Sequence, residues 1–331
     1  MAKKIKQQEP AQQPFRDYCD TWLVTQKKFS LRNSSYDVLE STFFLYIYPS
    51  IGDLRMEVVT TSDLQNLLNT RAETLSLNSL KKIYSALREV FYYAFTIQDL
   101  HTNPMNDVVF PYYKYSTNQG SKIVVLTEEE QIRLYKICLK RRKNKKLSFR
   151  LGPAVILLLA TGMRSGELLS LKCSNIDLER KEIFIDSTVS RIKNRDEKDD
   201  TCYCYEIHST KTKAGTRVIP LNEWAIKAIR LLQEEVFVEN DMNFLFTTKQ
   251  GKIYKHRMLA RDFDRLLTLA NIEHRTLHCL RHTFATQILR ENKNMIILSS
   301  ILGHTTPTTT YNTYIHLLDE EKETAIQLLD D

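Results

Sequence analysis

Residues 276–316 read TLHCLRHTFATQILRENKNMIILSSILGHTTPTTTYNTYIH and place basic, imidazole and phenol groups on short predicted helices. His278, Arg281 and His282 stand at i, i+3 and i+4, so a helix directs all three toward one side. The stretch ends near Tyr314 with few other polar groups between. The pattern predicts either a packed helical core or a set of groups around a phosphate, and the rest of the chain decides between them.

The second half of this stretch is predicted to begin a helix after Thr306, an N-cap residue that precedes Pro307. That helix carries Tyr311 and Tyr314 one turn apart. Taken singly, a tyrosine on a helix more often packs than attacks a bond. His304 follows Leu-Gly, and a histidine in that context is by itself more often a loop residue than a catalytic one. These residues therefore indicate chemistry only in combination with others.

The composition fits a globular chain of two domains. The chain has 331 residues, 42% of them hydrophobic, and a net charge of +7, which suits a polyanionic partner but also an ordinary basic enzyme. Its six cysteines lack metal-ligand spacing and are expected to be reduced thiols. The N-terminus lacks the apolar core of a signal peptide, and the most apolar run, 154–160, is too short to span a bilayer. We expect a cytoplasmic protein with no metal site and no membrane partner.

Composition and hydrophobic periodicity divide the chain. We expect a flexible tail over 1–13, a helical domain over 14–110, a linker over 111–124 and a second domain over 125–331. The clearest helical stripe covers 78–95. Strand-like segments occupy 181–221, and the last two are predicted to form a hairpin that turns at Gly215. The predicted fold class is mostly α with a small antiparallel β-sheet.

Arg164 is the first charged group that needs a partner. It lies in ATGMRSGELLSL, between buried helices predicted over 149–159 and 163–171. A buried arginine requires an anion. Glu167, one turn later, supplies one, so an ion pair within the core explains Arg164 as well as an anionic ligand does.

Lys211 is the second such group. It lies in HSTKTKAGTRVIPL, at the end of a predicted strand. Lysines at hairpin tips are usually only solvated, and Lys213 lies on the same strand face. Neither lysine alone is a strong signal.

Together these groups match the needs of phosphodiester cleavage by a protein nucleophile. Two guanidiniums grip the non-bridging oxygens of a phosphate as its charge builds. Imidazoles donate to the same oxygens or accept the proton of a phenol, and a lysine protonates the departing sugar hydroxyl. A tyrosine attacks and holds the phosphate covalently. The combination favours an enzyme that cuts nucleic acid over a packed core.

The chain resembles the tyrosine recombinases of the phage integrase family. The matching motifs are TGMRSGELLSLKCSNID, STKTKAGTRVIPL, LHCLRHTFAT and LGHTTPTTTYNTYIH. They occur in the family's order between about 126 and 316, and the helical region 15–109 is similar to the family's SAM-like core-binding domain. The resemblance implies an all-helical core-binding domain followed by an α+β catalytic domain.

The resemblance implies roles for the matching residues. The catalytic set comprises two phosphate-binding arginines, a lysine general acid, two supporting histidines and a tyrosine nucleophile, which are Arg164, Arg281, Lys211, His278, His304 and Tyr314. Two residues behind this set, of which the first steadies an arginine, are Glu167 and His282. Tyr311 and Lys213 remain the alternatives for the nucleophile and the general acid.

The resemblance also implies partners. The family exchanges a phosphodiester for a 3′-phosphotyrosyl ester of similar energy, so no cofactor is needed. Four protomers act on two double-stranded DNA segments with core sites, and accessory or excision factors are possible partners. The C-terminal tail 317–331 is acidic on one side and packs on its own domain or on a neighbouring protomer. Few residues precede the first helix, so we expect a simple core site or the absence of the arm-binding domain that many integrases carry.

The predicted function is integration and excision of a prophage or conjugative element. The alternatives are a Xer-like chromosome-dimer resolvase, a DNA invertase and, in a different class, a catalytically silent DNA-binding protein of the same fold. Basic side chains off the apolar stripes of the first domain are candidates for contact with DNA, although a solvated face explains each one alone: Lys27, Lys28, Arg32, Lys81, Lys82 and Arg88.

Overall fold

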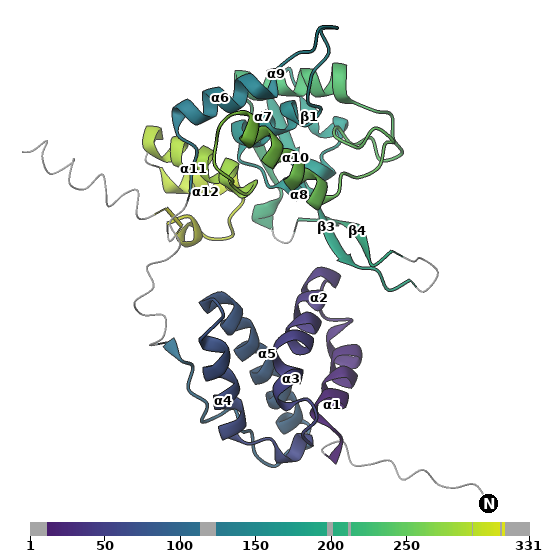
Figure 1. Ribbon diagram of the computed structural model, residues 1–331, viewed down its shortest axis with the longest axis vertical. Helices are drawn as coiled ribbons and strands as arrows, with labels where there is room; N and C mark the ends of the chain where they lie inside the picture. The colour runs from purple at the N-terminus through teal and green to yellow at the C-terminus, as the bar shows by residue number, and fades with distance from the viewer. Residues whose placement is uncertain are drawn as a thin grey trace, which may run out of the picture. The chain divides into compact units, whose positions relative to one another are not determined.

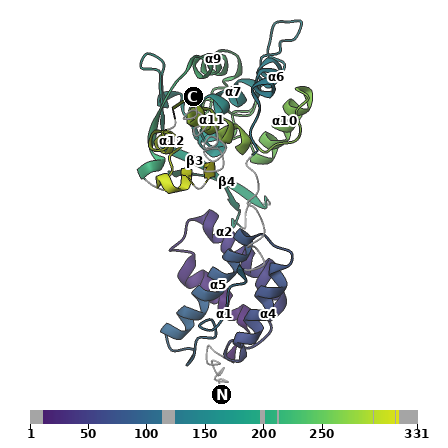
Figure 2. The ribbon, with the colours of Figure 1, turned by 90° about the vertical axis from the view of Figure 1, so that its left-hand side faces the viewer.

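The computed structural model of the protein describes residues 12–112, 124–196, 201–210, 213–292, 294–311 and 313–314. The chain forms two compact units, Met1–Ser121 with Ile192–Cys204 and Lys122–Arg191 with Tyr205–Asp331. Figures 1 and 2 show that both are mostly helical. Each has its own hydrophobic core, and each is described by itself.

The first unit is a set of helices around an aromatic core. Its helices are α1 (Phe15–Trp22), η2 (Leu23–Lys27), α2 (Asn33–Thr42), η3 (Phe43–Ile47), α3 (Tyr48–Ile51), η4 (Met56–Val58), α4 (Thr61–Ala72) and α5 (Leu77–Thr96). Phe15 of α1 stacks on Phe91 of α5 with ring centroids 5.5 Å apart, and it also lies against Phe43 of η3. These rings join three helices that are distant in the sequence.

Local sequence explains where these helices begin. Thr60 and Asp63 form a capping box at α4, since the Thr60 hydroxyl accepts from the Asp63 N–H at 3.2 Å and the Asp63 carboxylate accepts from the Thr60 N–H at 2.9 Å. The stripe predicted over 78–95 is confirmed as the buried face of α5. The π-helical segments η2 and η3 were not predicted, because apolar spacing alone does not distinguish a π turn from an α turn.

The second unit combines helices with short strands. Its helices are α6 (Glu128–Cys138), α7 (Gly152–Thr161), α8 (Ser165–Ser170), η6 (Cys173–Asn175), η7 (Lys213–Gly215), α9 (Glu223–Leu231), η8 (Leu232–Val236), α10 (His256–Leu269), α11 (His278–Asn292) and α12 (Met295–Leu302). The strands are β1 (Ile176–Asp177), β2 (Glu182–Ile185), β3 (Ser187–Lys193), β4 (Tyr203–Ser209) and β5 (Arg217–Pro220). The last residues of β3 and the first of β4 belong to the segment Ile192–Cys204, which is grouped with the first unit. Residues 307–311, 313 and 314 are also helical, as Thr306 and Pro307 predicted.

Helix α7 forms the centre of the second unit. All of its residues are buried, and it packs against α6, α8, α9 and α11. The unbroken apolar run at 154–160 predicted this burial. The helix ends at Gly162, whose left-handed backbone (φ 63°) turns the chain into α8. Arg164 therefore lies at a fixed junction between two buried helices.

The strands form two antiparallel sheets. One has the order β1-β2-β5, and the other pairs β3 with β4. The hairpin predicted between β4 and β5, with its turn at Gly215, is therefore wrong, because β5 pairs with β2. The reason is burial: Arg217 and Ile219 of β5 point into the core, where Ile219 lies opposite Ile183 of β2.

The predicted class, mostly α with a small antiparallel β-sheet, is confirmed. The six cysteines are free. No helix within the described ranges is long and apolar enough to cross a membrane. At the end of the predicted tail 1–13, the Gln13 carbonyl accepts a hydrogen bond from the Met56 N–H at 3.0 Å. Most of the predicted tail (1–11) and most of the predicted linker (113–123) lie outside the described residues.

Substitution of Gly162 by alanine is expected to destabilise the second unit by about 3 kcal/mol. The cost has two sources, since a left-handed backbone strains an alanine and a Cβ at this position would lie 2.3 Å from the Phe284 ring. Gly251→Ala is the matched control, because Gly251 has a similar φ of 72° and its nearest contact would be 3.1 Å. It should cost about 1 kcal/mol. Urea denaturation followed by circular dichroism measures both, and equal losses would contradict the packing argument.

Candidate active site

A buried carboxylate connects two arginines from separate elements. Glu167, in the first turn of α8, is 3% exposed. Its Oε1 accepts from Arg164 Nη1 at 2.9 Å and from Arg217 Nη1 at 3.0 Å, and its Oε2 accepts from Arg217 Nη2 at 2.9 Å. Oε2 also accepts from the backbone N–H of Arg164 at 2.8 Å, which fixes the start of α8. The ion pair that the sequence offered as an explanation of Arg164 is present.

The two arginines differ in exposure. The Arg217 side chain is 6% exposed, whereas that of Arg164 is 40% exposed, so part of the Arg164 guanidinium faces solvent. Burial acts to raise the pKa of Glu167, but the hydrogen bonds and charges of Arg217 and Arg164 outweigh it and hold that pKa below its ordinary value. One ionised carboxylate thus holds two guanidiniums and leaves positive charge at the surface.

Arg217 was not among the predicted site residues. Besides Glu167, its guanidinium binds the carbonyl of Ile301 in α12 and that of Gly215. Gly303 (φ 67°) ends α12 against it, and a Cβ there would lie 2.9 Å from Arg217 Nη1. The available signal was a lone arginine at an inward-facing position of an apolar strand, because such a charge requires a buried partner.

Arg281 of α11 connects three further segments. Its Nη1 donates to the Gly162 carbonyl at 2.8 Å, and its Nη2 donates to the Leu302 carbonyl at 2.8 Å and to His304 Nε2 at 2.9 Å. Burial, and then the charge of Arg164, lower the pKa of Arg281 to about 9, so it stays protonated at neutral pH. Within the described ranges no carboxylate forms an ion pair with it. Its buried charge therefore lacks a counter-ion.

His304 is neutral, and its tautomer is fixed. A guanidinium only donates, so His304 Nε2 accepts from Arg281, while Nδ1 carries the proton and donates to Thr310 Oγ1 at 2.7 Å. Burial, and then the charge of Arg281, lower the pKa of His304 to about 4, which agrees with a neutral ring. Thr310 was not predicted, because a threonine on a short helix carries no distinctive signal. Its buried hydroxyl orients His304, which in turn orients Arg281.

Tyr314 lies with its hydroxyl on His282. The Tyr314 Oη is 2.8 Å from His282 Nδ1, while the residue is only 1% exposed. Burial raises the pKa of Tyr314 to about 12, against a smaller opposing effect of Arg281. Burial, followed by His278 and Arg281, lowers the pKa of His282 to about 4. A neutral phenol therefore donates to a neutral imidazole.

His278 lies against His282, whereas Tyr311 lies at the protein surface. The His278 ring stands edge-on to His282 with centroids 4.6 Å apart, and burial, then Arg281 and Arg164, lower the pKa of His278. Tyr311 is 44% exposed and forms no side-chain hydrogen bond with the part of the chain that the structure describes. The geometry thus distinguishes the two candidate tyrosines.

Lys211, the predicted general acid, lies outside the described residues. The backbone of its alternative, Lys213, belongs to η7, and its side chain lies outside the part of the protein that the structure describes. The predicted tail 317–331 also lies outside the described residues. The structure therefore brings together every predicted site residue of the second unit that it describes.

The DNA-contact candidates of the first unit have different surroundings. Lys27 forms an ion pair with Glu89 and lies 4.9 Å from the centre of the Trp22 ring. Lys81 lies 5.9 Å from the centre of the Tyr112 ring. The other candidates include one half-buried arginine and three exposed side chains, which are Arg32, Lys28, Lys82 and Arg88.

The site as a whole concentrates positive charge beside a phenol. Arg164 and Arg217 share the buried carboxylate of Glu167, and Arg281 adds a third guanidinium that no carboxylate among the described residues pairs with. The neighbouring imidazoles are neutral. Among the described residues no three His, Cys, Asp or Glu side chains form a group that could hold a metal ion. The arrangement can bind an anion next to a nucleophile whose proton has an acceptor within hydrogen-bond distance.

Two family models match the chain. Residues 124–321 match the phage integrase family, and residues 14–71 match the SAM-like N-terminal domain of phage integrases. The resemblance seen in the four sequence motifs and in the helical first domain is thereby confirmed.

Curated relatives cover nearly the whole chain. A XerC-like tyrosine recombinase of Caldanaerobacter subterraneus subsp. tengcongensis is 25% identical over 95% of this chain and 82% of its own length. The integrase of Staphylococcus phage L54a is 25% identical over 95% of this chain and 93% of its own length.

Solved structures share the fold. The Tn1549 transposon integrase bound to transposon right end DNA has a TM-score of 0.73 at 21% identity and covers 95% of this chain and 99% of that one. A lambda integrase tetramer bound to a Holliday junction has a TM-score of 0.64 at 16% identity and covers 91% of this chain and 77% of that one.

Substitution of Glu167 by glutamine is expected to destabilise the second unit by about 3–5 kcal/mol at neutral pH, because it leaves two arginines without their buried anion. The folded-state pKa of Glu167 is depressed, so its stabilisation is present above the ordinary value of 4.5 and is lost as the pH falls below it. The variant should lose less stability in acid than the wild type.

Glu223→Gln is the control for Glu167→Gln. Glu223 pairs with Lys181 at 3.1 Å, but its side chain is 81% exposed, so the change should cost less than about 1 kcal/mol. Urea denaturation between pH 3 and 7 measures the free energy of unfolding of both variants. An equal loss in the two would contradict the conclusion that the buried Glu167 carboxylate stabilises the second unit.

Proposed function

Because the chain belongs to the phage integrase family, the site-specific tyrosine recombinases of phages and conjugative transposons, we propose that its buried Tyr314 is the nucleophile. The chain is a recombinase that cleaves and rejoins DNA. The observation that supports Tyr314 most is its 2.8 Å hydrogen bond to a neutral His282, beside the unpaired charge of Arg281.

Arg164 and Arg281 bind the scissile phosphate in this proposal. Arg164 extends from Glu167 toward solvent, and Arg281 carries a buried charge without a carboxylate partner. A phosphodiester supplies the missing anion, and two guanidiniums offset the charge that grows on its oxygens during attack. Arg217 and His304 are positioning residues, since Arg217 acts through Glu167 and His304 through Arg281.

The bond changes balance without a cofactor. Tyr314 Oη bonds to phosphorus as its proton passes to His282 Nδ1, and the bond from phosphorus to the 5′ sugar oxygen breaks. Lys211 donates a proton to that oxygen, in the role that the resemblance implies. The 5′-hydroxyl of a second strand then attacks the 3′-phosphotyrosine, and the same steps in reverse rejoin the DNA.

The protein without DNA holds this nucleophile inactive. The pKa of Tyr314 is about 12 and that of His282 about 4, so the proton stays on the phenol. A phosphate on the two arginines adds negative charge that favours a protonated His282. Because Tyr314 is 1% exposed, its segment must also shift before phosphorus reaches Oη. DNA binding therefore both exposes the nucleophile and activates it.

The proposal extends to the partners. The Tn1549 integrase is seen with transposon end DNA and lambda integrase as a tetramer on a Holliday junction. We propose that four copies of this chain act on two duplex core sites, with 317–331 docked on a neighbouring copy and accessory or excision factors setting direction. Exposed cations of the first unit, such as Lys82 and Arg88, contact the DNA backbone. A cytoplasmic location, where the DNA lies, follows from this proposal.

The alternative functions differ in substrate or in chemistry. A Xer-like resolvase or a DNA invertase would use the same site on other DNA junctions, so the sites in the genome decide between them and an integrase. A catalytically silent DNA-binding protein has no use for a buried tyrosine on an imidazole. The geometry around Tyr314 and Arg281 therefore favours the enzyme.

Cleavage should trap the protein on DNA through Tyr314. A nicked duplex that carries the junction between the element and the chromosome, identified by sequencing around the gene, prevents rejoining and leaves a covalent adduct visible in a denaturing gel. Tyr314→Phe should abolish the adduct, whereas Tyr311→Phe should retain it. An adduct in Tyr314→Phe would refute the assignment. Wild type that binds the duplex in a gel shift without forming an adduct would favour the silent DNA-binding protein.

His282→Gln should slow cleavage by about 10²- to 10⁴-fold, because glutamine keeps a hydrogen-bond acceptor but cannot take the proton. The cleavage rate of the variant should rise with pH toward the Tyr314 pKa of about 12, since hydroxide replaces the lost base. The control is His274→Gln, at an exposed histidine paired with Asp264, which should cleave like wild type. A loss of rate in His282→Gln without this change in pH dependence would indicate a structural role only.

A further inference from the structure

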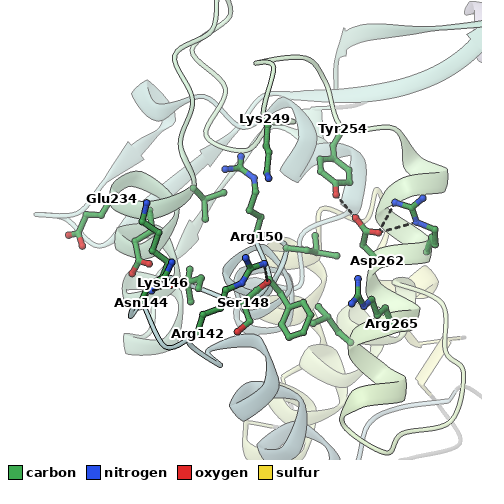
Figure 3. Close-up of a pocket in the computed structure, with 17 residues that line it drawn as sticks. Arg142, Asn144, Lys146, Ser148, Arg150, Glu234, Lys249, Tyr254, Asp262 and Arg265 are labelled. Atoms are coloured by element: carbon green, nitrogen blue, oxygen red, sulfur yellow. Dashed lines mark hydrogen bonds and ion pairs between the residues drawn. The ribbon is translucent and has the colours of Figure 1, made fainter.

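A cationic cavity lies at the opposite end of α7 from the active site. Its volume is about 800 Å³, and its wall comes from the α6–α7 loop, η8, α10 and the loop that precedes α10 (Figure 3). Arg150 and Leu151, directly before α7, line the cavity, whereas Gly162 at the other end of α7 binds Arg281. A helix of ten residues is about 15 Å long, so the two sites are separate.

The wall of this cavity carries uncompensated positive charge. Two of its acids are already paired, since Glu235 forms a two-bond ion pair with Arg141 (2.7 and 3.2 Å) and Asp262 pairs with Arg261 at 2.9 Å. Only Glu234 remains to balance the other cations of the wall. Within the described ranges, the cavity cations that no carboxylate pairs with are Arg142, Lys146, Arg150, Lys249 and Arg265.

Arg150 directly precedes α7 and has no carboxylate partner within the described ranges. It is half-buried, and among the described residues its guanidinium donates only to the Thr247 carbonyl, at 3.3 Å. Burial lowers the pKa of Arg150, as expected for a guanidinium that is partly withdrawn from water. It also lies just before the positive end of the α7 dipole, where no side chain caps the helix. A bound anion would satisfy all three features together.

The size and walls of the cavity limit the kind of anion. The Arg265 guanidinium lies 5.8 Å from the centre of the half-buried Phe149 ring, and Tyr254, which is stacked on Phe246 at 5.1 Å, also lines the cavity. A volume of about 800 Å³ falls in the range of small-molecule sites, about 300–1,000 Å³, and exceeds the needs of one phosphate. A DNA duplex presents a convex backbone, which suits an exposed row of cations rather than a concavity.

We propose that this cavity binds a small anion that carries at least two phosphate groups, either a nucleoside polyphosphate or free polyphosphate. Arg150 at the base of α7 and Arg265 on α10 bind it from two walls, and Lys249, Arg142 and Lys146 complete the cationic surround (Figure 3). The site is distinct from the DNA-cleaving residues and does not depend on their assignment.

Isothermal titration calorimetry of the full chain tests this proposal with sodium tripolyphosphate and with ATP, each without added metal. Saturable binding at one site per chain is expected for tripolyphosphate. Tighter binding of ATP would assign the natural ligand to nucleotides, and equal or weaker binding would assign it to phosphate groups alone. Absence of saturable binding to both would overturn the proposal.

Three variants test whether tripolyphosphate binds in this cavity. Arg150→Gln should weaken tripolyphosphate binding by about 10- to 100-fold, the effect of removing a hydrogen bond between charged groups. Arg265→Gln, on the second wall, provides an independent variant, and circular dichroism checks that each folds. Arg230→Gln removes an exposed arginine of α9 outside the cavity and should change the affinity by less than about twofold. An equal loss in Arg230→Gln would show a general charge effect and overturn the proposal.

A DNA-binding measurement tests whether the cavity contacts DNA instead of a small anion. Arg150→Gln and Arg230→Gln should bind a short linear duplex of arbitrary sequence equally well in a gel shift. A tenfold weaker binding of that duplex by Arg150→Gln than by Arg230→Gln would identify the cavity as a DNA contact, which contradicts the small-anion site. These outcomes do not depend on DNA cleavage.

Discussion

The buried carboxylate of Glu167 is the interaction on which the site depends. It fixes the start of α8, holds the partly exposed Arg164, and anchors Arg217, which in turn binds the end of α12. Segments distant in the sequence are thereby held around one negative charge. Since this anion pairs with Arg164 and Arg217 while Arg281 brings a third guanidinium, the site has an excess of positive charge that a phosphate can neutralise.

The sequence predicted the helical architecture and most of the site because strong local signals mark both. The apolar run before Gly162, the i, i+3, i+4 spacing in α11 and the N-cap before Pro307 each fix an element independently of the rest. The predicted pairing of β4 with β5 is wrong, because β5 pairs with β2. In that position Arg217 of β5 is buried and reaches Glu167. Which face of a strand is buried depends on tertiary packing, so strand propensity alone does not predict the pairing.

Two other features of the site also follow only from tertiary packing. His282 was predicted to lie behind the catalytic set, yet it contacts the Tyr314 hydroxyl, because the side of α11 that carries it meets the helical segment of Tyr314. Thr310, which fixes the His304 tautomer, has no signal in the sequence. The same packing that buries Tyr314 separates its pKa from that of His282, so the proposed nucleophile is protonated in the protein without DNA.

The central claim is that Tyr314 makes the covalent bond to DNA. The most direct test is tandem mass spectrometry of the protein–DNA adduct after digestion with trypsin and nuclease, since Tyr311 and Tyr314 share one tryptic peptide but differ in the fragment ions that carry the nucleotide. The account predicts a nucleotide on Tyr314 and an unmodified Tyr311. A nucleotide on Tyr311, or on any other side chain, would contradict it.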